Sequence, residues 1–256
     1  MENIQLFDSH CHYNDEKYDT DRDNIIKENI DKGITKAIVA GYSLEGSKRA
    51  IQIAEQYPKN LYATVGISPN DVDNIDLEEI KKIAQNSKVV AIGEIGLDYY
   101  WNKENKELQK ETFIKQIQIA NELNLPIVIH TREATIDTVE LLKTNPVIKK
   151  GIFHCCPLNQ ELIKEAVKLD FYISFSGNIT FKSSKNADRC IKLVPKDRIL
   201  IETDSPYMTP EPLRGQRNTP ANVRYTAQKI AEVLEIPLEE IANLTYENTM
   251  RIFNIK

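Results

Sequence analysis

The sequence lacks the features that would take the chain into or across a membrane. No apolar run approaches the roughly 20 residues of a membrane-spanning helix. The opening MENIQLFD has neither the basic stretch nor the long apolar segment of a secretory signal. Cysteine is sparse, and its spacing (Cys11, Cys155, Cys156, Cys190) fits no zinc knuckle and no small disulfide scaffold. We therefore expect a cytoplasmic protein with free thiols and no membrane partner.

Excess positive charge is missing as well. The formal net charge is −5, which argues against a broad, non-specific grip on nucleic acid, because such binding relies on basic surface. A small phosphate-binding cleft stays compatible with this charge. We expect short, weakly held substrates with marked salt sensitivity, and a monomeric chain.

Short apolar runs alternate with amphipathic segments along the whole chain. The strand-like runs cover residues 4–10, 36–42, 61–67, 89–96, 126–131, 151–155, 171–177 and 198–204. Segments such as 105–123 and 219–235 repeat apolar residues at three- and four-residue spacing, which is typical of helices. This alternation predicts an α/β fold, a TIM-like (β/α)8 barrel forming a single domain over residues 1–256. An open doubly wound sheet is the alternative, but no G-x-G-x-x-G follows the first strand-like run.

Histidine is scarce, and its placement is informative. The chain has four histidines, and two of them form the motif HCH at residues 10–12. Side chains two apart in a strand face the same side, so His10 and His12 can converge on one metal ion. His130 and His154 also end predicted strands, on the face where barrel enzymes place their active sites. The four imidazoles are therefore expected to meet at one rim.

Carboxylates complete this set. Glu94 lies inside an apolar run, where an unpaired charge is costly, and Asp204 ends the last run. Asp8 can share the face of His10, and Asp98 follows Glu94 in the next loop. Four imidazoles with Glu94 and Asp204 suit one or two divalent ions, with a carboxylate able to bridge. Such a centre polarises an ester or phosphoryl oxygen and activates water, which is hydrolase chemistry.

Two other nucleophile schemes are disfavoured. There is no G-x-S-x-G elbow for a serine hydrolase. Cys155 is adjacent to His154, and adjacent residues in a strand point to opposite faces, so a thiol–imidazole pair is not expected.

Six blocks of the sequence resemble those of the TatD-family metal-dependent hydrolases, a branch of the amidohydrolase superfamily. They are FDSHCH, GEIGLDYY, PIVIHTREA, GIFHCC, ISFSGNITFK and ETDSPYMTPEPLRGQRNTPANV, in this order between residues 7 and 223. The H-x-H motif is shared with many amidohydrolases, whereas GEIGLDY and ETDSPY are much more specific.

The resemblance implies a TIM-like barrel with a two-metal centre and TatD-type deoxyribonuclease activity, as an exonuclease cleaving phosphodiester bonds with metal-activated water. It assigns the first ion to His10, His12 and Asp204, the second to His130 and His154, and the bridge to Glu94. Asp204 is also the candidate to accept a proton from the attacking water, so Asp204 and Glu94 are the expected catalytic residues. Oxygen-donor substrates favour Mg²⁺ or Mn²⁺, while the imidazoles leave Zn²⁺ possible.

The chain departs from the family pattern at two positions. The family often reads G-I-H-P after its third strand, where this chain has Ser68, which puts in doubt any proton transfer or substrate contact from that loop. The family's HCF at the sixth strand is HCC here, and the smaller Cys156 is expected to widen that side of the cleft.

Candidate substrate-binding residues follow the strand ends. Arg132 lies two residues after His130, where a guanidinium suits a phosphate oxygen. Lys182, Arg214 and Arg217 lie in loops after the seventh and eighth strands, a common phosphate-binding region of such barrels. Tyr99, with Tyr100 and Trp101, forms an aromatic run that can stack on an unpaired base, with ordinary loop packing as the alternative.

Three functions are compatible with a metal site of this kind. A phosphodiesterase acting on DNA or oligonucleotide ends is favoured. A deacylase or esterase using the same metals on an ester or amide is the alternative, since the ligands do not discriminate between them. A barrel that holds metal without catalysis is least favoured, because structural zinc sites are usually closed and cysteine-rich.

Overall fold

Eight parallel strands form the centre of the molecule in the computed structural model, which describes residues 4–72 and 75–256. The prediction that the chain lacks a secretory signal used the segment MENIQLFD. Its first three residues, 1–3, lie outside the described residues. The strands pair in sequential order, as the barrel prediction requires. They are β1 (Leu6–Cys11), β2 (Ile34–Ala40), β3 (Leu61–Val65), β4 (Val89–Asp98), β5 (Ile127–Arg132), β6 (Gly151–Phe153), β7 (Tyr172–Phe175) and β8 (Ile199–Ile201).

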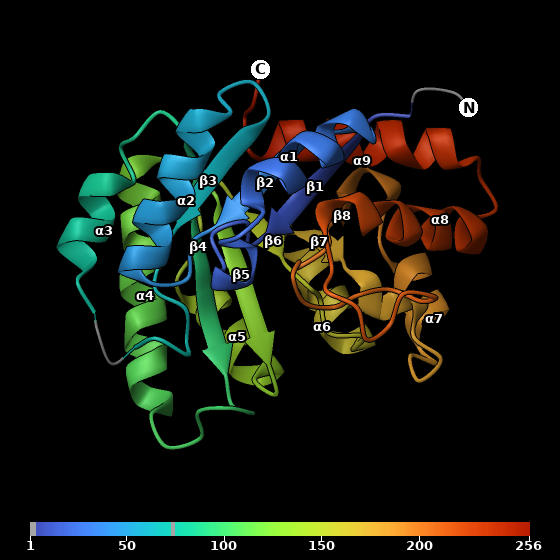
Figure 1. Ribbon diagram of the computed structural model, residues 1–256. Helices are drawn as coiled ribbons and strands as arrows, with labels where there is room; N and C mark the ends of the chain where they lie inside the picture. The colour runs from blue at the N-terminus through green and yellow to red at the C-terminus, as the bar shows by residue number, and fades with distance from the viewer. Residues whose placement is uncertain (1–3, 73–74) are drawn as a thin grey trace.

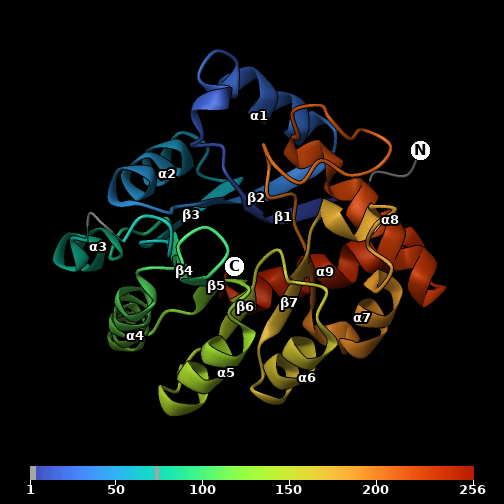
Figure 2. The same ribbon diagram turned by 90° about the horizontal axis from the view of Figure 1, so that it is seen from below.

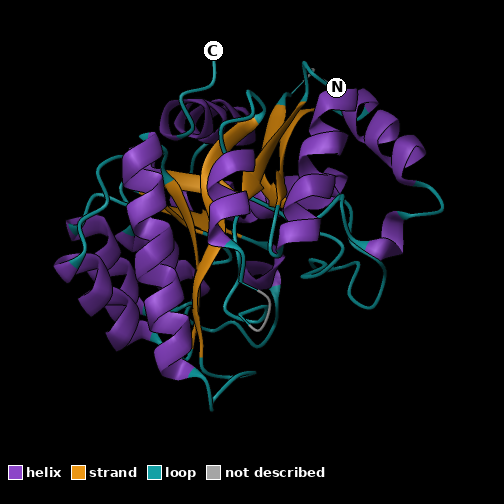
Figure 3. Ribbon diagram, turned by 90° about the vertical axis from the view of Figure 1, so that its left-hand side faces the viewer, coloured by secondary structure: helices purple, strands orange, loops and turns teal. Residues whose placement is uncertain are grey.

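A helix follows each strand and packs on the outside of the sheet (Figures 1 and 3). Seen from the C-terminal ends of the strands, these helices form a ring (Figure 2). They are α1 (Arg22–Asp31), α2 (Leu44–Gln56), α3 (Leu77–Ile83), α4 (Lys106–Leu123), α5 (Thr135–Thr144), α6 (Gln160–Lys168), α7 (Ala187–Leu193) and α8 (Val223–Leu234), with α9 (Leu238–Ile252) added. The TIM-like (β/α)8 barrel is confirmed. None of the helices in the described part of the chain has the length and apolarity needed to cross a membrane.

The core has two parts. The larger one lies between the strands and the surrounding helices. In the smaller one, side chains from several strands pack against Phe253, the residue after α9. These side chains include Phe7, Ile38, Val128, Ile152 and Leu200. In Figure 2, α9 crosses behind the centre of the ring, at the N-terminal end of the strands. The interior of the barrel is therefore filled with side chains at that end, and the predicted ligands lie at the other, C-terminal end.

Hydrogen bonds close the barrel between β8 and β1. The amide of Asp204 donates to the carbonyl of His10 at 3.0 Å, and the amide of His12 donates to that of Ser205 at 2.7 Å. The buried carboxylate of Asp8 accepts from the amide of Thr203 at 3.0 Å. This closure brings β1 and the loop after β8 together. Three of the predicted metal ligands, His10, His12 and Asp204, therefore lie side by side.

Candidate metal centre

All six predicted ligands lie together at the C-terminal end of the barrel. His10 belongs to β1, Glu94 to β4 and His130 to β5. The other three follow strand ends closely, namely His12, His154 and Asp204. His10 is fully buried, and the other five are buried or largely so. The donors come from five different strands, so the barrel topology is what assembles them.

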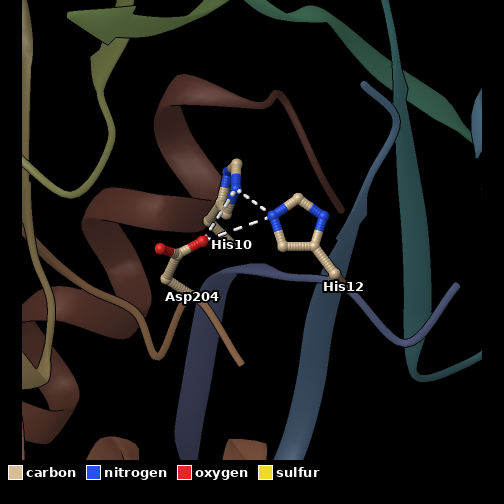
Figure 4. A group of neighbouring side chains, drawn as sticks. All are labelled: His10, His12 and Asp204. Atoms are coloured by element: carbon tan, nitrogen blue, oxygen red, sulfur yellow. Dashed lines mark hydrogen bonds and ion pairs between the residues drawn. The ribbon is translucent and has the colours of Figure 1, made fainter. Parts of the chain in front are cut away.

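The first donor group joins β1 to the loop after β8 (Figure 4). The Nε2 atoms of His10 and His12 are 3.2 Å apart. Oδ1 of Asp204 is 3.7 Å from Nε2 of His10 and 3.3 Å from Nε2 of His12. The convergence expected for the H-x-H pair is therefore present, with Asp204 as the third donor.

The second donor group joins β5 and β6. Nδ1 of His130 lies 3.3 Å from Nε2 of His154. Oε1 of Glu94 is 3.0 Å from that Nδ1 and 3.6 Å from Nε2 of His154. Its other oxygen, Oε2, is 3.5 Å from Nε2 of His10. Glu94 thus offers one oxygen to each group.

These spacings fit divalent ions. Nitrogen and oxygen donors stand about 2.0–2.2 Å from a transition metal ion, so two donors of one tetrahedral ion are about 3.4 Å apart. The donor–donor distances in both groups, 3.0 to 3.7 Å, bracket this value. The residues present fit a metal centre that Glu94 can bridge.

Irregular strand pairing occurs at two of the predicted ligands and affects the direction of their side chains. The pairing of β1 with β2 shifts register between Asp8 and Cys11, around His10. The pairing of β4 with β5 shifts between Ile92 and Ile95, around Glu94. Such bulges bend a strand and redirect a side chain, and they are common beside active sites.

The charges of the carboxylates depend on the imidazoles. Burial alone would raise the pKa of Glu94, but the charge of His154 and contacts with His10 and His130 hold it well below its ordinary value. The same balance holds for Asp204, where burial is outweighed by the hydrogen bond and charge of His12, so that its pKa is lowered. Both groups are therefore ionised at neutral pH, as metal ligands must be.

Asp98 fixes the orientation of His130. Oδ2 of this fully buried carboxylate is 2.9 Å from Nε2 of His130, on the far side of the ring from Glu94. Oδ1 accepts from the backbone amides of Tyr100 and Trp101 at 2.9 and 3.0 Å. Burial works to raise the pKa of Asp98, but these donors bring it down to about 2. A carboxylate that accepts from Nε2 leaves Nδ1 unprotonated and able to bind metal.

Glu202 lies behind the ring of His154, at ion-pair distance rather than hydrogen-bond distance. It is fully buried, and its Oε1 is 3.5 Å from Nδ1 of His154. This oxygen also accepts from the amide of Cys155 at 2.7 Å and the hydroxyl of Ser176 at 2.9 Å. Sequence analysis did not single out Glu202. The available signal was a carboxylate at the end of an apolar strand, two residues before Asp204. Asp8, by contrast, serves the closure of the barrel rather than the donor groups.

The donor atoms face a cavity of about 750 Å³. Its described walls include five of the six ligands, all but the fully buried His10, together with Tyr42, Tyr207, Trp101 and Arg132. Ser68 also lines it and is 3% exposed; its hydroxyl accepts from the amide of Asn70 at 3.2 Å. The position where the family often has histidine therefore faces the cavity. Cys156 is buried and is not among the described lining residues, so the structure does not show the expected widening of the cleft there.

Of the predicted substrate residues, Arg132 lies on the cavity wall. Its guanidinium lies 3.8 Å from the ring centre of Tyr100 and 5.5 Å from that of Trp101. Trp101 also lines the cavity and is 66% exposed.

The other predicted substrate residues are not among the described residues that line the cavity: Tyr99, Lys182, Arg214 and Arg217. Tyr99 is buried, and its hydroxyl donates to Asp137 at 2.6 Å, so for this residue the packing alternative describes the structure. Arg214 packs against the ring of Phe181, and Arg217 pairs with Asp21.

A barrel that brings four imidazoles and two carboxylates to the open end of its strands belongs to the class of metal-dependent hydrolases. Comparison with known proteins agrees with this class. The family described as TatD related DNase matches residues 7–254, and the chain belongs to this family.

Two bacterial relatives carry the same general description. The chain is 45% identical to the uncharacterized metal-dependent hydrolase YabD of Bacillus subtilis, covering 98% of this chain and 99% of that protein. It is 37% identical to YcfH of Escherichia coli K12, also an uncharacterized metal-dependent hydrolase, covering 98% and 96%. Among solved structures, the TatD homologue YJJV of Escherichia coli superposes with a TM-score of 0.94 at 27% identity, covering 99% and 100% of the two chains.

Proposed function

We propose that this hydrolase is a deoxyribonuclease that shortens DNA or oligonucleotides from an end, with two divalent ions in the donor groups that share Glu94. The observation that carries the choice of substrate is the wall of the cavity. Arg132, a cation suited to a phosphate oxygen, and Trp101, an exposed ring suited to stacking on a base, line the same space as the donor atoms.

The chain's own residues have separate tasks in this reaction. Divalent ions, when bound, neutralise charge on the phosphodiester and lower the pKa of a water molecule. Glu94 offers one carboxylate oxygen to each donor group and so keeps the two ions next to each other. Asp204 is ionised and accepts the proton that the attacking water gives up. Arg132 orients a non-bridging phosphate oxygen, and Trp101 stacks against an unpaired base.

The ions and the setting are part of this proposal. Mg²⁺ or Mn²⁺ suits a phosphate substrate, whereas four imidazoles also accommodate Zn²⁺. We assign the protein to the cytoplasm as a monomer; its cysteines are free thiols, in keeping with that compartment.

One observation favours a different substrate. The cavity carries four carboxylates, those of Asp15, Asp71, Glu94 and Asp204, and Arg132 is the one lysine or arginine among its described walls. Before ions are bound, this charge repels a long polyanion. A deacylase or esterase acting on a neutral or singly charged ester or amide is therefore the second candidate.

End-labelled single-stranded DNA provides the test. The metal-stripped protein is supplied in turn with Mg²⁺, Mn²⁺ and Zn²⁺, and its His130→Ala variant serves as the control. Metal-dependent shortening from one end, absent in the control, would support the exonuclease and identify its ion and polarity. Intact DNA with every ion, combined with hydrolysis of a model ester, would replace the proposal with the deacylase.

A further inference from the structure

A second large cavity lies at the opposite end of the barrel. It encloses about 730 Å³ beside the N-terminal ends of β4, β6, β7 and β8 and the chain that follows α9. In Figure 1 this end is near the C-terminus label, and the arrowheads of β4 and β5 point away from it. Val89 lines this basal cavity, and Glu94 lies five residues further along the same strand. The two sites are therefore roughly 16 Å apart along β4.

The basal cavity is basic in an acidic protein. Its walls carry Lys88, Lys149, Lys150, Arg198 and Arg251. Lys256, the last residue of the given sequence, also lines it and adds no net charge, because its α-carboxylate offsets its ammonium group. Asp170 is the one acidic side chain among its described lining residues. The cavity at the metal centre has the reverse composition, and the whole chain has a net charge of −5. Positive charge is thus gathered at the end of the barrel away from the metal centre.

Most of this charge has no partner. Arg198 pairs with Asp170 at 2.7 Å. Within the described residues, no carboxylate lies within ion-pair distance of Lys88, Lys149 or Lys150. Lys88 is held in place because its Nζ donates to the carbonyl of Pro58 at 2.5 Å. Glu55 acts to raise the pKa of Lys88, but burial and the charge of Lys36 outweigh it. Like charges with little counter-charge repel each other, and an anion bound among them relieves that repulsion.

Two aromatic rings add to this site. The ammonium groups of Lys36 and Lys88 lie 5.5 and 5.4 Å from the ring centre of Tyr62, which lines the cavity. Tyr172 lines it as well. Burial first, and then the charge of Lys36, lower the pKa of Lys88. Two cations are therefore gathered on one ring at the edge of the cavity.

The backbone holds Lys150 in place. Lys150 has a φ of 60°, a left-handed conformation that is costly for a side chain with a Cβ. Its carbonyl accepts from the amide of Ile127 at 3.0 Å, which ties it to the start of β5. Residues held in such conformations cluster at ligand-binding sites, where the surrounding structure maintains them.

We propose that the basal cavity binds a polyphosphate chain, of a nucleoside triphosphate or of inorganic polyphosphate. The cations come from well-separated segments, before β4, before β6, before β8 and in α9, so they surround more than one phosphate group. The volume lies within the range of small-molecule sites, about 300–1,000 Å³. This site is separate from the metal centre and does not depend on the proposed nuclease activity.

Calorimetric titration of the full-length protein at low ionic strength, without added divalent ions, tests the proposal. ATP, tripolyphosphate and orthophosphate are compared as ligands. The test variant is Lys149→Glu with Lys150→Glu. The control, Lys27→Glu with Lys115→Glu, makes the same change of charge at exposed positions of α1 and α4. Lys150→Gln is a milder second variant for the case in which the double reversal does not fold.

We expect ATP and tripolyphosphate to bind with one site per chain, and orthophosphate more weakly. Because the test variant loses charge-assisted contacts to the phosphates, it should bind at least about tenfold more weakly, and the control should bind within about twofold of the original chain. Binding should persist in Glu94→Gln, in which the metal bridge is altered. Tighter binding of ATP than of tripolyphosphate would identify a nucleotide as the ligand, and equal binding the inorganic chain.

Three results would overturn the proposal. The first is no binding of either polyphosphate. The second is equal affinity of the test and control variants. The third is loss of binding in Glu94→Gln, which would locate the ligand at the metal centre.

Discussion

Replacing Asp98 with asparagine changes one contact of the metal centre and leaves its neighbours in place. The amide oxygen of the asparagine can still accept from the backbone amides of Tyr100 and Trp101, which Oδ1 of Asp98 binds at 2.9 and 3.0 Å. Its NH₂ group then faces Nε2 of His130, which Oδ2 approaches at 2.9 Å. An NH₂ group donates, so Nε2 must become an acceptor and the ring proton must move to Nδ1.

This proton is on the wrong atom for metal binding. Nδ1 of His130 is the nitrogen 3.0 Å from Glu94 and 3.3 Å from His154. We expect Asp98→Asn to lower the affinity for the ion at His130 and His154 by about 10- to 100-fold, the usual effect of losing such a partner. This corresponds to about 1.4–2.7 kcal/mol. Hydrolytic activity at limiting metal should fall in parallel and recover in part at high metal concentration.

Competition with a chromophoric chelator measures that affinity. Asp137→Asn is the matched control, because Asp137 pairs with Lys110 at 2.8 Å and holds Tyr99 without contacting His130. Circular dichroism melts show whether both variants fold. Metal affinity of Asp98→Asn within about twofold of the original chain would refute the tautomer argument.

Four further predictions follow from the cavity and the donor set. Arg132→Ala should lower kcat/KM for a phosphodiester by about tenfold or more, as expected for the loss of a charged hydrogen bond. It should lower kcat/KM for a neutral ester much less. Equal losses on both substrates would contradict the role assigned to Arg132. Trp101→Ala should raise KM on single-stranded DNA by about five- to 100-fold, since stacking is worth about 1–3 kcal/mol per base, with an unchanged melting temperature; an unchanged KM would exclude stacking. Ser68→Ala removes two hydrogen bonds, from the amide of Asn70 and to the carboxylate of Asp71, and should cost about 1–2 kcal/mol of stability in urea titrations while leaving turnover intact. A large loss of turnover would show that Ser68 takes part in catalysis. A divalent ion at about 100 times its Kd should stabilise the fold by about 2.7 kcal/mol, or raise Tm by about 5–10 °C, and the shift should shrink in Glu94→Gln; an equal shift would argue against metal binding by Glu94.

The architecture and the meeting of the six candidate ligands could be predicted from the sequence alone. Apolar runs of strand length alternating with amphipathic helices leave few ways to bury both faces of a parallel sheet, and a closed barrel is one of them. Once the strands are parallel, their C-terminal ends must meet at one rim. Polar residues at those ends, such as His130 and Asp204, are therefore brought together whatever the details of the loops.

The tertiary structure decided how each ligand is presented. His130 offers Nδ1, whereas His10, His12 and His154 offer Nε2. The ring nitrogen that is used depends on strand bulges and on the carboxylate behind the ring, such as Asp98. The bulges and the position of this carboxylate are set by residues distant in the sequence. The alternation of side chains along an ideal strand therefore does not reveal which ring nitrogen faces the metal site.

Loop residues and the basal cavity depend on tertiary structure for the same reason. Tyr99 and Trp101 are two residues apart in one aromatic run, yet Tyr99 is buried against Asp137 and Trp101 is exposed at the cavity. Lys88, Lys150 and Arg251 look like scattered surface charges in the sequence. They share one cavity because the barrel also gathers the N-terminal ends of its strands, and no local pattern records that proximity.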